Sequence, residues 1–176
     1  RSDIEGSEPI PASAFLVQDT MMSSNLVFGG TRVGTVEHLL SAIAGLGIDN
    51  LLIRVSASEI PIMDGSAAPF VGLLLDAGFC EQEAAKKFIK IIRPVRVKVE
   101  DKWAELRPYE GFELNFEIDF DHPAIDKNFQ HAQLQFSTQN FIEQLSSART
   151  FGFLRDIEAL RQNNLALGGS MDNAIV

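Results

Sequence analysis

The stretch that decides the fold is residues 34–47, Gly-Thr-Val-Glu-His-Leu-Leu-Ser-Ala-Ile-Ala-Gly-Leu-Gly. Its apolar residues recur at the three- and four-residue spacing that is typical of a helix with one buried face. The sequence therefore predicts a helix over residues 36–46. Thr35 is the candidate N-cap, and Gly45 and Gly47 are expected to end the helix. The predicted buried face consists of Leu39, Leu40, Ile43 and Leu46.

Strand and turn signals surround this helix on both sides. Before it, residues 14–27 are predicted to be extended, and Gly29 and Gly30 mark a turn. After it, the aliphatic run at residues 50–57 predicts a buried strand. Residues 59–66 contain Pro and Asp-Gly and predict a loop. A second helix is expected over residues 68–76, before Gly78.

The second half of the chain is dominated by strand signals. In residues 112–120 apolar and polar residues alternate strictly, which predicts one buried and one solvated face, as in an antiparallel sheet. Helices are expected at residues 138–145, capped by Ser137 or Thr138, and at 154–161. A terminal strand is expected after Gly168 and Gly169. The other predicted strands are residues 88–92, 95–99, 103–106 and 132–136.

Both halves therefore mix strands and helices in runs, and not in strict alternation. This pattern predicts the α+β class, with two-layer α/β sandwich domains. The charged stretch 81–87 is a candidate link, so we expect a first domain over residues 1–84 and a second over 85–176.

Composition limits the classes of function. The chain has 176 residues and a net charge of −9, which argues against a nucleic-acid binder because phosphate binding needs an excess of Lys and Arg. The single Cys80 excludes an intrachain disulfide and fits a reducing compartment. No apolar run reaches the ~20 residues that cross a bilayer, so stable membrane insertion is not expected.

Glu37 and His38 lie at the predicted helix start, and two interpretations of each stay open. His38 is either an imidazole that packs locally or a metal ligand. Glu37 is either a carboxylate stabilised by the helix dipole and the free N–H groups of the first turn, or a general base acting on water. Zinc sites take three or four protein ligands, and neither His122 nor His131 has metal-ligand spacing with His38.

Two further residues also have two interpretations. Thr150 is either an ordinary hydroxyl at the end of a helix or a hydrogen-bond donor to a developing oxyanion. Phe120, at the end of the alternating strand, is either a core residue or a ring that stacks on a base or sugar. Arg149 is expected to be a structural ion-pair partner.

Six strings in this chain resemble, in the same order, the zinc-dependent UDP-3-O-acyl-N-acetylglucosamine deacetylases of lipid A biosynthesis. The resemblance extends from about residue 19 to residue 176. It implies two α+β domains of similar fold with the active site between them. The strings are residues 35–39, 44–50, 59–70, 102–105, 119–126 and 148–153.

The resemblance implies roles for individual residues. His38 would be the first of three Zn²⁺ ligands, Glu37 the general base, and Thr150 the donor to the oxygen of the reaction intermediate. Phe120 would stack on uracil, with Asp119 nearby in the nucleotide pocket. Residues 153–176 would form a βαβ insert that holds the 3-O-acyl chain. The sugar site would include Phe151, and the acyl passage Leu154, Ile157, Ala166, Gly169, Ser170 and Met171.

The same resemblance places the family's first strands before Arg1. Its other two zinc ligands, its general-acid His and a nucleotide-binding Lys would lie after Val176. We therefore expect this chain alone to be inactive, and the whole protein to be a cytoplasmic, monomeric enzyme that acts on a UDP-linked acylated amino sugar. The alternatives are a non-catalytic scaffold that binds the nucleotide sugar and acyl chain without metal, and a metal-free enzyme that relies on Glu37.

Overall fold

The computed structural model describes residues 1–176 apart from residues 21, 124, 163–167 and 174–176. It contains helices and antiparallel sheets, so the predicted α+β class is confirmed. The chain forms two units, one from residues 1–79 with 141–176 and the other from residues 80–140. Within the described ranges, no helix has the length and apolar character needed to cross a bilayer.

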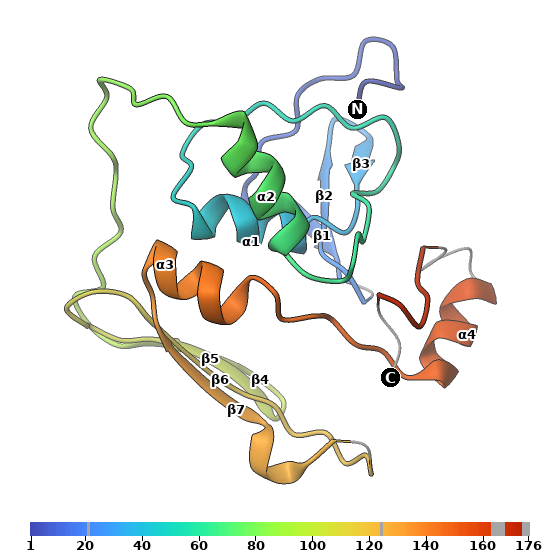
Figure 1. Cartoon of the computed structure of the whole chain (residues 1–176), viewed down its shortest axis with the longest axis vertical. Coiled ribbons are helices and arrows are strands. Elements are labelled where there is room, and N and C mark those ends of the chain that lie inside the picture. Colours follow the sequence, from blue (N-terminus) through green and yellow to red (C-terminus); the bar gives the residue numbers. More distant parts are fainter. Residues whose placement is uncertain (21, 124, 163–167, 174–176) are drawn as a thin grey trace. The chain divides into compact units, whose positions relative to one another are not determined.

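The first unit contains a three-stranded antiparallel sheet (Figure 1). The short helix η1 (Ala14–Leu16) leads into β1 (Val17–Asp19), and β2 (Asn25–Phe28) pairs with both β1 and β3 (Thr31–Val33). Gly29 and Gly30 form the predicted turn between β2 and β3, with φ of 55° and 76°. Such angles are accessible to glycine without a Cβ penalty.

Helix α1 (Glu37–Gly45) follows β3 and confirms the central prediction. The predicted N-cap was wrong, because Thr35 has a φ of 57° whereas an N-cap residue normally has an extended backbone. The N-cap is Val36, and its side chain makes no capping bond. A β-branched residue in the left-handed region is strained by about 1–3 kcal/mol. This strain lies two residues before Glu37, the first of the two residues of chemical interest.

Helix α2 (Ala68–Ala77) packs against α1, and Gly78 ends it with a φ of 75°. The predicted second helix and its stop are thus confirmed. The helix begins after a turn in which Ser66, fully buried, accepts a hydrogen bond from the Ala68 N–H. The buried apolar residues of this unit come from the sheet, both helices and the later segment; they are Leu26, Val33, Val36, Ala42, Ile60, Ala67, Phe70, Val71, Phe141 and Ile157.

The later segment of the first unit is anchored by Phe141, which is 2% exposed. Just before Phe141, at the end of the second unit, lies helix α3 (Thr138–Asn140); the Ser137 hydroxyl accepts a bond from the Asn140 N–H, so the predicted cap is confirmed. The helix continues as the π-helix η3 (Phe141–Leu145). The ring of Phe141 lies so close to Gly45 of α1 that an added Cβ would come within 2.2 Å of it. Glycine at position 45 is therefore a packing requirement.

We expect Gly45→Ala to destabilise this unit by about 1–3 kcal/mol, because the new methyl group must displace the Phe141 ring or α1. The control is Gly72→Ala in α2, where no atom lies within 4 Å of the added Cβ. Since alanine is the better helix former, that change should stabilise by about 0.5–1 kcal/mol. Urea denaturation monitored by circular dichroism measures both. Equal effects of the two substitutions would contradict the packing argument.

The predicted buried strand at residues 50–57 was wrong. The structure shows no strand there, and Leu52 is 72% exposed. The aliphatic run fits a strand, but a strand needs a partner for its N–H and C=O groups. A main-chain hydrogen bond joins this run to the N-terminal segment, from the Ser2 N–H to the Val55 carbonyl at 2.8 Å, but it does not make a strand ladder.

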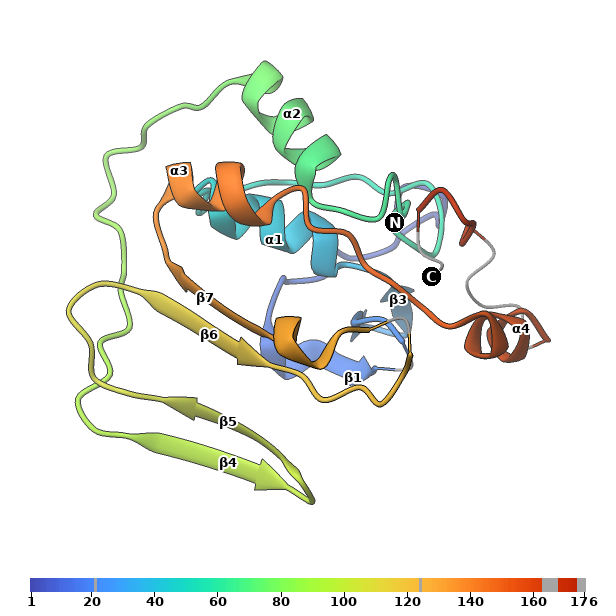
Figure 2. The ribbon, with the colours of Figure 1, turned by 60° about the horizontal axis from the view of Figure 1, so that its bottom comes forward.

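The second unit contains two antiparallel hairpins, which Figure 2 shows as pairs. The first pairs β4 (Val95–Val99) with β5 (Lys102–Leu106). The second pairs β6 (Glu113–Glu117) with β7 (His131–Gln135), and the short helix η2 (Lys127–Phe129) lies in the loop between them. These elements confirm four of the predicted strands.

Two expectations for this unit were wrong. Residues 88–92 form no strand, and Phe88 is 82% exposed. The alternating strand has no buried apolar face, since Phe116 and Ile118 are 66% and 42% exposed. The alternation of apolar and polar residues shows which side of a strand is suited to burial. That side becomes buried only if a second layer of the structure covers it. The described residues of this unit contain only short helices, which leave these faces uncovered.

Helix α4 (Leu154–Gln162) confirms the last predicted helix. The expected acyl-chain insert, residues 153–176, extends beyond what the structure describes, because residues 163–167 and 174–176 fall outside it. The predicted terminal strand lies largely in the second of these gaps. The insert and the predicted domain boundary between residues 84 and 85 stay predictions.

Candidate functional site

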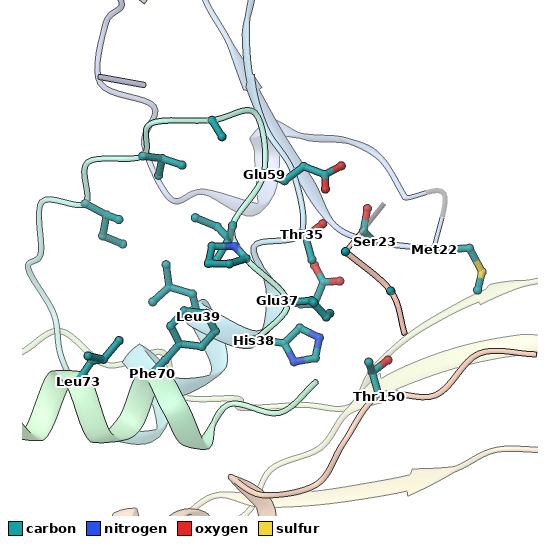
Figure 3. Close-up of a pocket in the computed structure, with 18 of the residues that line it drawn as sticks. Met22, Ser23, Thr35, Glu37, His38, Leu39, Glu59, Phe70, Leu73 and Thr150 are labelled. Atoms are coloured by element: carbon teal, nitrogen blue, oxygen red, sulfur yellow. The ribbon is translucent and has the colours of Figure 1, made fainter. Parts of the chain in front are cut away.

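The start of α1 opens into a cavity of about 810 Å³ in the first unit. Its polar part is formed by the segment between β3 and α1 and by residues 150–152 (Figure 3). Its apolar wall comes from residues 51–53 and 60–62 and from α2. A cavity of this size with a few polar groups at one end is typical of a small-molecule site.

Glu37 and His38 both line this cavity from the first turn of α1. Glu37 is fixed by Ser24, whose N–H donates to Glu37 Oε2 at 2.9 Å. The Val36 N–H in turn donates to the Ser24 carbonyl at 3.2 Å. These two bonds tie the helix start to the residue before β2. The carboxylate is thereby held at the cavity by groups that do not depend on any ligand.

The His38 ring is half-buried and borders the same space as Glu37. In Figure 3 the ring projects toward Thr150, and the Glu37 carboxylate lies above the ring, near Thr35. The ring is thus placed where an ion or a polar group of a ligand has room to reach it. A purely interior packing role for this imidazole does not fit the geometry.

Thr150 reaches the cavity from a part of the chain far from α1. Its N–H donates to the Gly65 carbonyl at 2.7 Å. Arg149 donates from Nε to the Asp64 carbonyl at 2.8 Å and from its guanidinium to the Asp172 carbonyl. The expected ion-pair role of Arg149 is therefore replaced by bonds to main-chain carbonyls. These contacts hold Thr150 beside the 64–66 turn.

That turn is itself rigidly built. The Ser66 hydroxyl donates to Asp64 Oδ1 at 2.8 Å, and the Ser66 N–H donates to the same oxygen at 2.9 Å. The hydroxyl bond is the largest cause that holds the pKa of the Asp64 carboxyl below its usual range; the N–H bond and nearby Arg149 act in the same direction. Residues 64–66, which the sequence marks only as a loop, thus form the support on which Thr150 rests.

A model of the family described as LpxC, UDP-3-O-acyl N-acetylglycosamine deacetylase, matches residues 1–176, the whole chain. The chain belongs to this family.

Curated relatives carry the name UDP-3-O-acyl-N-acetylglucosamine deacetylase. One from Psychrobacter cryohalolentis is 93% identical over 176 residues, covering all of this chain and 55% of the relative. One from Shewanella frigidimarina is 59% identical, covering all of this chain and 58% of the relative. One from Acinetobacter baumannii is 58% identical over 175 residues, covering 99% of this chain and 58% of the relative. The chain therefore spans little more than half the length of these LpxC relatives.

A zinc ion is implied by the family resemblance, and the donors present fit it in part. His38 offers an imidazole nitrogen to a cavity that also contains a carboxylate, which are ligand types that zinc accepts. Among the residues the structure describes, no three His, Cys, Asp or Glu side chains are grouped closely enough to bind a metal ion. At this cavity, His38 is the residue whose imidazole could serve as one zinc ligand.

The structure brings some of the predicted substrate residues to the same cavity. Phe151, Ile157 and Gly169 line it together with Thr150. Leu154 on α4 and Met171 are exposed and are not among the lining residues. Ser170 is half-buried and bonded to Asn173 through its N–H. Ala166 lies outside the described residues.

Phe120 and Asp119 belong to the second unit, just after β6. Phe120 is 37% exposed, so part of its ring is open to a ligand. A fully buried core position, the other interpretation of this residue, does not fit that exposure. The predicted role in nucleotide binding is compatible with it and stays a prediction.

Polar cavity residues that the sequence analysis did not assign to the site include Ser23, Thr35 and Glu59. Glu59 reaches the site because residue 59 pairs in parallel with Gly34 in an isolated bridge. A pairing between residues 25 positions apart leaves no local signal. Thr35 offered one signal, its place next to Glu37, which we interpreted as a helix cap.

Proposed function

We propose that the full-length protein hydrolyses the 2-acetamido group of UDP-3-O-(hydroxyacyl)-N-acetylglucosamine, giving acetate and the free amine, in lipid A biosynthesis. One observation supports this most directly. Glu37, His38 and Thr150 come together at one cavity in a chain that matches the LpxC family along its whole length. A cytoplasmic location and a monomeric state are further parts of the proposal.

When bound, zinc would supply an acidified water and a positive charge that polarises the acetamide carbonyl. His38 would hold the ion through its imidazole, as one of three ligands. Glu37 would accept a proton from the attacking water as that water adds to the carbonyl carbon. Its bond from the Ser24 N–H uses Oε2, which leaves Oε1 available to the proton. A carboxylate fixed in this way loses little orientational entropy on reaching the transition state.

Thr150 would donate a hydrogen bond from its hydroxyl to the carbonyl oxygen as negative charge develops there. Such a donor accelerates the reaction only if it is already in place, since reorganisation during the reaction costs free energy. The Gly65 and Arg149 contacts meet this requirement, because they fix the main chain on which the hydroxyl is carried.

The two ends of the substrate would bind to different side chains. Phe120 would stack on uracil with Asp119 nearby, and Phe151 would border the sugar. The hydroxyacyl chain would lie along Ile157 and the remaining residues of the predicted insert, Leu154, Ala166, Gly169, Ser170 and Met171. The apolar wall of the cavity next to Ile157 supports an aliphatic ligand on this side.

The alternative is a scaffold that binds the nucleotide sugar and the acyl chain without metal. For this chain taken alone, one observation favours the scaffold: among the described residues, no three His, Cys, Asp or Glu side chains are grouped so that they could hold a metal ion. We accordingly propose that the 176-residue chain is inactive while the full-length protein is a zinc enzyme.

The test compares the two lengths directly. We expect the full-length protein to contain stoichiometric zinc and to release acetate from the UDP-linked substrate, and a chelator to abolish that release. The 176-residue chain should show neither property. Metal analysis and an acetate-release assay measure both. Robust turnover by the short chain, or metal-free full-length protein with unchanged turnover, would refute the proposal.

A further inference from the structure

The end of β6 carries a side-chain clamp that the site above does not include. Gln130 lies directly before β7 and is 8% exposed, in a unit whose other described residues are mostly exposed. Its side-chain Oε1 accepts a bond from the Phe120 N–H at 2.6 Å. Its Nε2 donates to the Phe120 carbonyl at 3.1 Å. One amide thus satisfies both main-chain polar groups of Phe120.

This clamp replaces a strand partner that the hairpin does not provide. Regular pairing between β6 and β7 ends at Glu117 and His131. One more main-chain bond follows, from the Ile118 N–H to the Gln130 carbonyl at 2.9 Å. Beyond it the chain leaves β6 in a loop that contains η2, in the lower part of Figure 1. The Gln130 amide has the donor and acceptor of a peptide group, so it extends the ladder to Phe120 without a further strand.

The loop closed by this clamp has its own internal order. Asp126 accepts two bonds from Asn128 at 2.9 Å, one from the N–H and one from the side-chain amide. Lys127 pairs with Asp121 at 3.1 Å. Phe120 stands at the point where the strand becomes this loop, and its ring remains partly exposed. The Gln130 amide contacts the Phe120 main chain directly, through its N–H and its carbonyl.

We propose that Gln130 is a positioning residue for the uracil-binding ring: it acts through the Phe120 main chain and does not touch the ligand. This inference rests on the proposed role of Phe120 in nucleotide binding. Stacking on an aromatic ring requires the ring to hold one plane, and a residue at the free end of a strand would otherwise fray. A buried amide with two main-chain bonds keeps that end ordered before the ligand arrives, which lowers the entropic cost of binding.

The test uses the full-length protein and UDP as the probe, with affinity measured by isothermal titration. Phe120→Ala should weaken UDP binding about tenfold, the scale of a lost base–aromatic stack. Gln130→Met keeps the size of the side chain and removes both bonds, and it should weaken UDP binding about fivefold. The kcat of deacetylation at saturating substrate should stay within about twofold, because the clamp lies outside the reacting groups. Gln133→Met, at an exposed glutamine three residues later on β7, is the matched control and should bind UDP normally.

The double variant separates positioning from general damage. If Gln130 acts through the ring, Gln130→Met should have almost no further effect once Phe120 is alanine. Gln130→Glu keeps an oxygen for the Phe120 N–H but turns a second acceptor toward the Phe120 carbonyl at a buried position, so its affinity should fall at least as far as that of Gln130→Met. Two results would overturn the positioning role of Gln130 and leave the nucleotide role of Phe120 untouched. One is an equal loss of UDP affinity from Gln130→Met in the wild-type and Phe120→Ala backgrounds, and the other is full UDP affinity in Gln130→Met. An unchanged affinity in Phe120→Ala would overturn the nucleotide role and the clamp together.

Discussion

Glu37→Gln in the full-length protein is expected to lower kcat about 10²–10⁴-fold, the range for loss of a positioned general base. The substitution is conservative for the fold. A glutamine Oε1 can still accept the Ser24 N–H that Glu37 Oε2 accepts at 2.9 Å, so the tie between α1 and the residue before β2 should survive. What disappears is the ability of the group to take up a proton. Steady-state kinetics should therefore show a loss in kcat with little change in KM.

Glu59→Gln is the matched control for that experiment. Glu59 also presents a carboxylate to the cavity, but it comes from the parallel bridge with Gly34 and not from the first turn of α1. We expect its activity to stay within about threefold of wild type, since it has no assigned proton-transfer role. Bound zinc should be unchanged in both variants. If Glu59→Gln proved as damaging as Glu37→Gln, the base would have to be reassigned.

Local patterns predicted a large part of this fold. Helices α1 and α2 and the Gly29-Gly30 turn follow from spacing, glycine positions and breakers that lie within a few residues of one another. Strand 95–99 follows from alternation and β-branched residues in the same way, and its partner begins three residues after it. In each of these elements the hydrogen-bond partners are close in sequence. The local sequence pattern is therefore enough to predict the element.

The predictions that were wrong all concern a partner that is distant. Residues 50–57 and 88–92 are suited to a strand, but pairing depends on a second strand that their own sequence cannot specify. Phe116 is suited to a buried face, but burial depends on a layer to cover it. Thr35, with a φ of 57°, directly follows Gly34, and Gly34 pairs with residue 59, which comes after α1 in the chain.

The residues of the candidate site also differ in whether their arrangement depends on near or distant parts of the sequence. Glu37 and His38 are adjacent on one helical turn, so their shared orientation was predictable from the sequence alone. The approach of Thr150 to that turn depends on the Gly65 carbonyl, 85 residues earlier in the chain, and only the resemblance to LpxC proteins indicated it. Gln130 gave no signal at all, since a glutamine next to a strand usually faces solvent.

The second large effect is expected for His38→Gln, and it concerns metal content before activity. Zinc is held by a small set of ligands, and even loss of a group that only orients a ligand weakens binding about 10–100-fold. Loss of His38 itself should exceed that range, because glutamine cannot supply an imidazole nitrogen to the cavity. We therefore expect purified full-length His38→Gln to contain little zinc and to release no measurable acetate. The fold should be retained, since the ring is only half-buried.

His131→Gln is the control, because His131 is exposed and bonds Asn115 across the β6–β7 hairpin at 3.0 Å. Its zinc content and activity should match those of wild type. The distinctive outcome is the dependence on added metal. His38→Gln, which lacks one zinc ligand but keeps Glu37, should regain part of its activity when excess zinc is supplied. Glu37→Gln, which binds zinc but lacks the general base, should not respond to added zinc. Full zinc occupancy in His38→Gln would remove this imidazole from the ligand set and leave it a role in substrate contact alone.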